Sequence, residues 1–245
     1  MSRVRFDHIA IGMARLADAP AVLAGRLGGL PDSGGPAAGF RWACWRYAGG
    51  GRLEALEPRG EDGFLHRFLA RRGPGIHHVT FKVPSLRATC DRAAAHGYGI
   101  VGYDDADPSW ATAYLHPKRA LGIVVQLAES SAEEEPRPWA VPPGPPDPPP
   151  PVTVLGLRLR ARSRERARVQ WEAILEGEAG EGPAGELVYR WPGSPMRLVV
   201  EVDPATEEGP LVIEVASARA LELPEGPLPL LGAVFERRPA EAPSP

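Results

Sequence analysis

The chain has 245 residues, a formal net charge of −3 at pH 7 and a hydrophobic content of 43%. This length is enough to bury a substantial core, either as one large domain or as two ordinary ones. No apolar run is long enough to cross a membrane, and the charged N-terminal strand lacks a signal-peptide pattern, so we expect a cytoplasmic protein. The two cysteines, Cys44 and Cys90, predict buried thiols and exclude a disulfide framework.

Charge and chemistry are unevenly divided along the chain. Residues 1–128 hold 16 Lys and Arg against 11 Asp and Glu, whereas the remaining residues hold 12 against 20. All six histidines and both cysteines lie in the first part, so we expect any catalytic or metal-binding site to lie there. Its mild basic excess suits an anionic small molecule and is too small to indicate nucleic acid binding.

The first 72 residues predict a strand, a helix, two further strands and a second helix. Residues 4–11 alternate, with Ile9 and Ile11 on one face and His8 and Ala10 on the other. Gly and Pro make residues 30–39 a predicted loop. The other predicted elements are a helix over 14–28, strands over 40–47 and 52–57, and a short helix over 64–72.

The next segment repeats this plan. Residues 75–83 alternate again, with His78, Thr80 and Lys82 opposite an apolar set. Ser85 is the predicted N-cap of a helix that ends before Gly97. Strands are predicted over 99–103, 111–116 and 122–127. His77, on the apolar side, fits either a hydrogen-bonded core histidine or a ligand.

Two polar pairs mark an internal duplication. His8 and His78 are 70 residues apart, and Glu54 and Gln126, on the last strands, are 72 apart. Each repeat thus offers one polar side chain from its first strand and one from its last. The alternative is that these are unrelated strand residues.

Five ordered motifs within residues 4–128 resemble the vicinal oxygen chelate superfamily (glyoxalases, bleomycin resistance proteins and dioxygenases), and most of all its methylmalonyl-CoA epimerase-like members. The motifs are Asp7-His8-Ile9-Ala10-Ile11, Arg52-Leu53-Glu54-Ala55-Leu56-Glu57-Pro58, Gly75-Ile76-His77-His78-Val79, His116-Pro117-Lys118 and Gly122-Ile123-Val124-Val125-Gln126-Leu127. The resemblance implies an α+β fold in which paired βαβββ modules form an open barrel around a divalent metal. Its ligands would be His8, Glu54, His78 and Gln126. Such a nitrogen and oxygen set suits Mn, Co, Ni, Zn or Fe without discriminating among them.

The resemblance also implies a function: an isomerase or lyase that acts next to the carbonyl of an acyl-CoA or 2-oxo substrate. Glu54 and Gln126 would be its catalytic residues, Trp42 and Lys118 would contact substrate, and a homodimer is compatible with the family. Two departures argue against epimerase activity. Gln126 replaces a family glutamate, and Trp42 aligns with a second family carboxylate. An amide binds metal through its oxygen but cannot be a general base, and a missing base typically costs about 10² to 10⁴ in rate.

Two alternative functions follow from the same residues. A protein that lost its catalytic carboxylates could bind a small molecule without turnover, as the antibiotic-sequestering members of the superfamily do. Iron held by His8, Glu54 and His78 would instead indicate a dioxygenase, although the iron enzymes of the family favour a carboxylate where Gln126 stands.

The second half of the chain predicts a linker and a degenerate copy of the first domain. Residues 129–151, rich in Glu and Pro, predict a semi-rigid spacer. Residues 152–238 repeat the strand and helix order without histidines, with strands over 152–160, 187–191, 197–202, 211–215 and 231–237 and a helix over 164–176; residues 239–245 are a tail. We therefore expect residues 1–128 to fold and to bind metal without the second domain.

Overall fold

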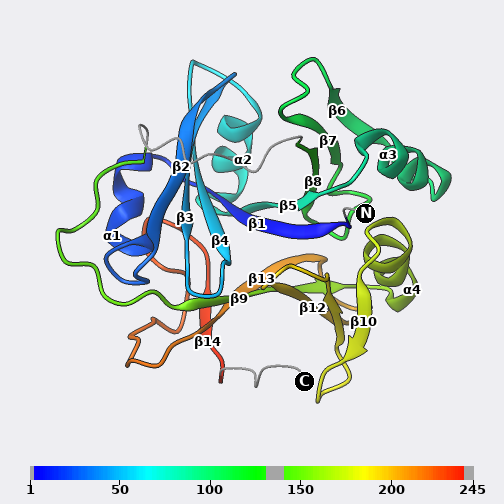
Figure 1. Ribbon diagram of the computed structural model, residues 1–245. Helices are drawn as coiled ribbons and strands as arrows, with labels where there is room; N and C mark the ends of the chain where they lie inside the picture. The colour runs from blue at the N-terminus through cyan, green and yellow to red at the C-terminus, as the bar shows by residue number, and fades with distance from the viewer. Residues whose placement is uncertain (1–2, 131–140, 240–245) are drawn as a thin grey trace. The chain divides into compact units, whose positions relative to one another are not determined.

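A computed structural model describes residues 3–130 and 141–239 (Figure 1). The start of the predicted linker, 131–140, and the tail from residue 240 lie outside the described residues. The elements, in order, are β1 Arg5–Gly12, η1 Leu16–Asp18, α1 Ala19–Leu23, β2 Leu30–Ala37, β3 Phe40–Arg46, β4 Arg52–Pro58, α2 Phe64–Arg72, β5 Gly75–Lys82, α3 Leu86–Ala95, β6 Ile100–Asp104, β7 Ala111–Leu115, β8 Val124–Glu129, β9 Thr153–Ala161, α4 Arg164–Arg168, the π-helical η3 Val169–Ile174, β10 Glu178–Glu181, β11 Leu187–Arg190, β12 Arg197–Val202, β13 Gly209–Ala216 and β14 Phe235–Arg237.

The strand order confirms the α+β fold and the internal duplication. An eight-stranded sheet has the order β2-β3-β4-β1-β5-β8-β7-β6, in which the first module supplies four neighbouring strands and the second module the other four. A six-stranded sheet has the order β10-β11-β12-β9-β13-β14. Its first four strands repeat the order of the first module. The fourth module is reduced to β13 and β14, with no helix between them among the described residues.

The chain divides into two compact units that do not follow its linear order. Unit 1 comprises residues 1–9, 77–135 and 157–211, and unit 2 comprises residues 10–76, 136–156 and 212–245. Each unit therefore combines one module of the first half with part of the second half. The boundaries 1–128, 129–151, 152–238 and 239–245 remain a prediction.

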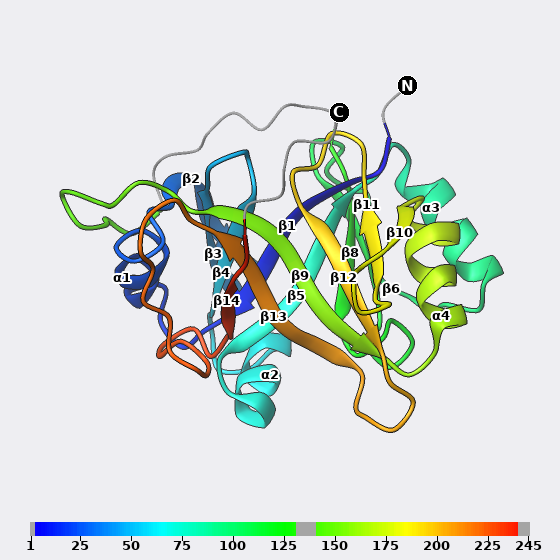
Figure 2. The same ribbon diagram turned by 90° about the horizontal axis from the view of Figure 1, so that it is seen from below.

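Unit 1 is built around an aromatic cluster that joins both halves of the chain. Phe81 on β5 lies 5.0 Å from Phe6 on β1, 5.9 Å from Trp171 on η3 and 4.7 Å from Trp191, measured between ring centroids. All four side chains are buried. Helices α3 and α4 lie side by side (Figure 2), and Arg92 Nε of α3 donates to Ile174 O of η3 at 2.8 Å.

The predicted loop over residues 30–39 is wrong, because residues Leu30–Ala37 form β2 and pair with β3 through a bulge between Pro31 and Ser33. Strand β2 is at the edge of its sheet, where a proline can be accommodated although it has no N–H to donate. The Gly and Pro residues of this segment indicated a loop, but here they belong to an edge strand, which tolerates them. Strand β10 was also missed.

The predicted helix over residues 14–28 is much shorter than expected. Helix α1 spans Ala19–Leu23, and only hydrogen-bonded turns continue to Gly28, which has a φ of 74°. The carbonyl of Pro149 approaches so closely that a Cβ at Gly28 would overlap it. Val152 N also donates to Leu27 O at 2.9 Å, so the end of the predicted linker packs within unit 2.

Candidate metal centre

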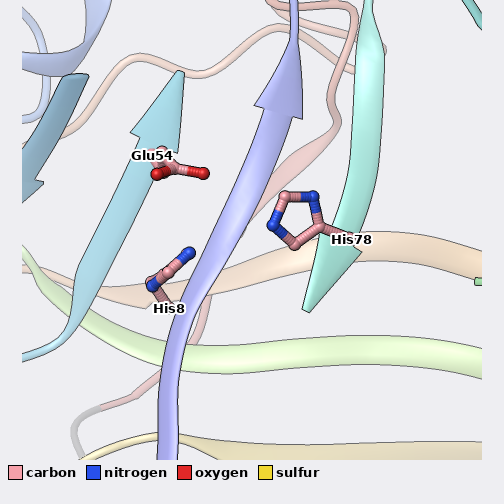
Figure 3. A group of neighbouring side chains, drawn as sticks. All are labelled: His8, Glu54 and His78. Atoms are coloured by element: carbon pink, nitrogen blue, oxygen red, sulfur yellow. The ribbon is translucent and has the colours of Figure 1, made fainter. Parts of the chain in front are cut away.

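Three side chains from three strands bring possible metal ligands together (Figure 3). His8 is on β1, Glu54 on β4 and His78 on β5, and one ligand atom from each lies within 4.8 Å of the others. The residues are 6%, 8% and 6% exposed. Buried imidazoles and a buried carboxylate need compensating partners, and a divalent cation is one such partner.

The local sequence explains why these side chains point the same way. In β1 and β5 the residues that follow each histidine, Ile9 and Val79, are fully buried on the opposite face. Glu54 is paired with Cys44 across β3 and β4, while the adjacent Leu53 belongs to the core on the other face. The period of two in a strand thus fixes which side chains face the cluster.

Gln126 is linked to His8 through Thr80. The Thr80 hydroxyl donates to Gln126 Oε1 at 2.8 Å and lies 2.9 Å from His8 Nε2. Gln126 Nε2 donates to the Tyr114 hydroxyl at 3.2 Å. Thr80 is fully buried, and Gln126 is 8% exposed. The amide oxygen that the sequence predicts as a fourth ligand is therefore connected to the His8 imidazole through a single hydroxyl group.

Asp7 orients the His8 ring. Its Oδ2 lies 2.8 Å from His8 Nδ1, and both side chains are nearly inaccessible to solvent. A carboxylate on one ring nitrogen holds the proton there and makes the other nitrogen, Nε2, the ligand atom.

His77 and His78 interact through their Nδ1 atoms, which are 2.9 Å apart. Burial lowers the pKa of His77 to about 4. Burial, followed by the proximity of His77 and His8, lowers the pKa of His78 well below its ordinary value. A neutral imidazole is the form that binds metals, so these surroundings suit a ligand at His78. His77 fits the hydrogen-bonded alternative.

The two predicted substrate-contacting residues, Trp42 and Lys118, differ in their surroundings. Trp42 is partly buried and packs against the small apolar cluster of Ala10, Leu56 and Leu65, opposite Leu56 across β3 and β4. It shares a face with Glu54, so it can form an apolar wall beside the carboxylate. Lys118 is exposed in the turn between β7 and β8.

Three residues around the site were not assigned roles from the sequence: Asp7, Thr80 and Tyr114. Thr80 lies two residues after His78, so alternation along the strand could have identified it. Asp7 adjoins His8, but nothing in the pattern distinguishes a hydrogen bond to the ring from solvent exposure. Tyr114 contacts Gln126 because the two are paired across β7 and β8, and this register cannot be read from the sequence.

Comparisons with known sequences agree with the fold. Residues 7–114 match the family model described as Glyoxalase/Bleomycin resistance protein/Dioxygenase superfamily. The protein named "Uncharacterized protein YqjC" from Bacillus subtilis (strain 168) is 26% identical over 92 residues, which are 36% of this chain and 64% of that protein. The chain thus spans just under two-thirds of that relative.

Comparisons with solved structures extend the likeness. A mutant 4-hydroxymandelate synthase from Streptomyces coelicolor has a TM-score of 0.60 at 15% identity, covering 89% of this chain and 72% of that chain. Hypothetical protein BH1468 from Bacillus halodurans C-125 has a TM-score of 0.50 at 24% identity, covering 55% and 99%. Methylmalonyl-CoA epimerase from Mycobacterium tuberculosis has a TM-score of 0.49 at 26% identity, covering 52% and 89%. The first two likenesses show a shared fold.

None of the described helices has the length and apolar character needed to span a membrane.

Proposed function

Because residues 7–114 carry a domain of the glyoxalase/bleomycin resistance/dioxygenase superfamily, we propose that this protein is a metal-dependent enzyme acting next to a carbonyl group. The clustering of His8, Glu54 and His78 carries the proposal. Gln126 Oε1 is the proposed fourth ligand. The proposed reaction is the isomerisation of an acyl-CoA or 2-oxo substrate, or a lyase-type bond cleavage in such a substrate.

The donor set fits a divalent metal. Two imidazoles and one carboxylate give a mixed nitrogen and oxygen site, which Mn, Co, Ni, Zn and Fe all accept. Such an ion supplies Lewis acidity, which polarises a carbonyl and stabilises negative charge on its oxygen. Glu54 would be the only anionic ligand, since Gln126 is neutral.

The residues around the ligands orient them and limit the chemistry. Asp7 fixes the His8 ring, and Trp42 with Leu56 forms an apolar surface on the face that carries Glu54. Gln126 and Trp42 stand where the epimerases of the family carry carboxylates, and neither side chain can accept a proton from substrate. The loss of both bases favours chemistry other than two-base epimerisation.

A dioxygenase is the second candidate, and one observation favours it. Two histidines and one carboxylate, with ligand atoms within 4.8 Å of one another, are the donor types that hold the metal in non-haem iron oxygenases. In that case Gln126 would lie beside the iron as a neutral residue and not as a charged ligand.

Elemental analysis of the purified full chain tests the metal site. We expect about one equivalent of a transition metal in the wild type, and its loss in His8→Ala and His78→Ala. Glu54→Gln should weaken binding because it removes the anionic ligand. His96→Ala, at the exposed end of α3, is the matched control and should retain full occupancy. Full occupancy in both histidine variants would refute the site.

A substrate screen separates the candidate functions. The metal-loaded protein is tested by thermal shift with acyl-CoAs and 2-oxo acids, and any hit is assayed for turnover and for oxygen consumption. Turnover without oxygen consumption supports the isomerase or lyase. Oxygen consumption that requires iron supports the dioxygenase. Tight binding with no turnover would instead identify a small-molecule binding protein.

A further inference from the structure

Thr80 occupies a place in β5 where an apolar β-branched residue would be the ordinary choice. Its side chain is fully buried, between neighbours Val79 and Phe81 that are also fully buried on the opposite face. Burying a hydroxyl costs free energy unless it forms hydrogen bonds. The Thr80 hydroxyl has two partners, His8 Nε2 and Gln126 Oε1. Its polarity is therefore used at the candidate metal centre.

The hydrogen bonds fix which end of the Gln126 amide faces Thr80. Thr80 donates to Oε1, while Nε2 donates to the Tyr114 hydroxyl, so each end of the amide has a partner of the correct type. Turning the amide over would place its N–H₂ group against the Thr80 hydroxyl and its oxygen against Tyr114. The backbone supports this row, because Gln126 is in register with Thr80 on one side and with Tyr114 on the other.

Two acceptors compete for the one hydroxyl proton of Thr80. With Asp7 accepting the Nδ1 proton of neutral His8, Nε2 carries a lone pair, and this lone pair and Gln126 Oε1 both lie within 2.9 Å of the Thr80 oxygen. A cation bound to Nε2 removes the competition and leaves the hydroxyl to Gln126 alone. Because a carbonyl oxygen has two lone pairs, Oε1 can accept from Thr80 and still bind the cation.

From this geometry we infer that Thr80 is a positioning residue that makes Gln126 an oxygen ligand. The inference rests on the proposed metal site, and it assigns the fourth ligand through a hydroxyl that lies outside the five sequence motifs. Removing that hydroxyl frees the amide to rotate, so metal affinity falls although every ligand residue is still present. Changes to groups that orient metal ligands typically cost about 10- to 100-fold in affinity.

The test compares Thr80→Val, Thr80→Ser and Thr89→Val in the full chain. Thr89 on α3 is the matched control, because it is equally buried and its hydroxyl bonds only to Ser85 O among the hydrogen bonds found. Cobalt affinity is measured by competition with a chromophoric chelator, and the visible absorption of the bound cobalt reports its ligand set. We expect Thr80→Val to weaken binding at least about 10-fold and to change the spectrum. Thr80→Ser keeps the hydroxyl, so it should retain the wild-type affinity and spectrum. Thr89→Val should leave the affinity and the spectrum unchanged.

A double-mutant comparison shows whether Thr80 acts through Gln126. In a Gln126→Ala background, Thr80→Val should cost little further affinity, because the side chain that it positions is gone. An equal loss in both backgrounds would overturn the inference, as would wild-type affinity and spectrum in Thr80→Val. If Thr80→Val does not fold, Thr80→Ala replaces it in the same comparison. A wild-type protein that binds no cobalt would overturn the metal site itself, which the other outcomes leave standing.

Discussion

The Asp7 carboxylate lies 2.8 Å from His8 Nδ1, on the ring nitrogen opposite the one that faces Thr80 and the ligand cluster. Both side chains are almost fully buried, at 9% and 7% exposure. A carboxylate in this position fixes the tautomer and the orientation of the imidazole and makes Nε2 more basic.

Asp7→Asn should therefore weaken metal binding by about 10-fold or more while leaving the ligands in place. The amide can still accept from Nδ1, but it lacks the charge that favours a proton there. Asp91→Asn, at an exposed position of α3, is the control for a changed charge in the same half of the chain. Metal affinity equal to wild type in Asp7→Asn would show that Asp7 serves the local fold and not the site.

The second half of the chain should be required for the first to fold. Residues 1–128 alone would expose Phe6 and Phe81, because Trp191, which contacts both rings, and Trp171, which contacts Phe81, would be absent. Expression of residues 1–128 should yield aggregated or partly unfolded protein, seen by size exclusion and circular dichroism. This is the opposite of what the Pro-rich linker predicts from the sequence. A soluble, metal-binding fragment with a cooperative thermal transition would support the sequence-based prediction instead.

Trp171→Ala measures the same packing in the full chain. Removing a fully buried tryptophan typically costs about 3 to 5 kcal/mol of unfolding free energy. Trp110→Ala, at a half-buried position on the same unit, should cost much less. Urea denaturation followed by circular dichroism compares the two, and similar losses would mean that the aromatic cluster does not join the two halves energetically.

Much of the site could be predicted because strand alternation is a local signal. His8, Glu54 and His78 were placed on strands, with apolar neighbours on the opposite face, and the structure gathers them. Helix α3 was likewise marked by its N-cap, and Ser85 Oγ accepts from Ala88 N at 3.2 Å. Strand β2 was missed because its Gly and Pro residues mask an edge strand whose pairing is set by β3.

The remaining features depend on contacts between distant residues. The hydrogen-bonded row of Thr80, Gln126 and Tyr114 depends on how β5, β8 and β7 are paired in register. Threonine is also common in β-strands, so its presence does not predict a buried polar role. The two compact units mix modules from both halves, whereas composition alone indicates two successive domains and a spacer. Nothing in the sequence pattern relates Trp171 to Phe81, which lie 90 residues apart.

The Cys90 thiol should react slowly in the native protein. Burial, followed by the nearby Asp91, raises its pKa to about 11. At pH 8 only about 0.1% would then be thiolate, which is the reactive form. A disulfide reagent should modify Cys90 far more slowly in native protein than in urea, with a rate that rises as pH approaches 11. Cys44→Ser isolates this thiol, and native reactivity equal to that of the unfolded chain would contradict the burial.

Gln126→Glu tests how far the missing carboxylate limits catalysis. The new side chain can still accept from Thr80, and Tyr114 can donate to it in place of accepting, so the hydrogen-bonded row survives. An added anionic ligand should tighten metal binding. If the site lacks only a base, the variant should also gain about 10² in the rate of proton abstraction. Deuterium entry from solvent into methylmalonyl-CoA, at the carbon next to the thioester, measures that rate.

The Gln126→Ala variant is the control, because it removes the ligand oxygen without supplying a base. Gain of exchange in the glutamate variant alone would show an epimerase-like scaffold whose base was replaced by an amide. Exchange at enzymatic rates in the wild type would contradict the argument that Gln126 and Trp42 disable this chemistry, and would require another base on the same face. If neither the wild type nor Gln126→Glu shows exchange although both bind metal, the result would favour a different substrate or simple ligand binding. Restoring the carboxylate would then have restored no function.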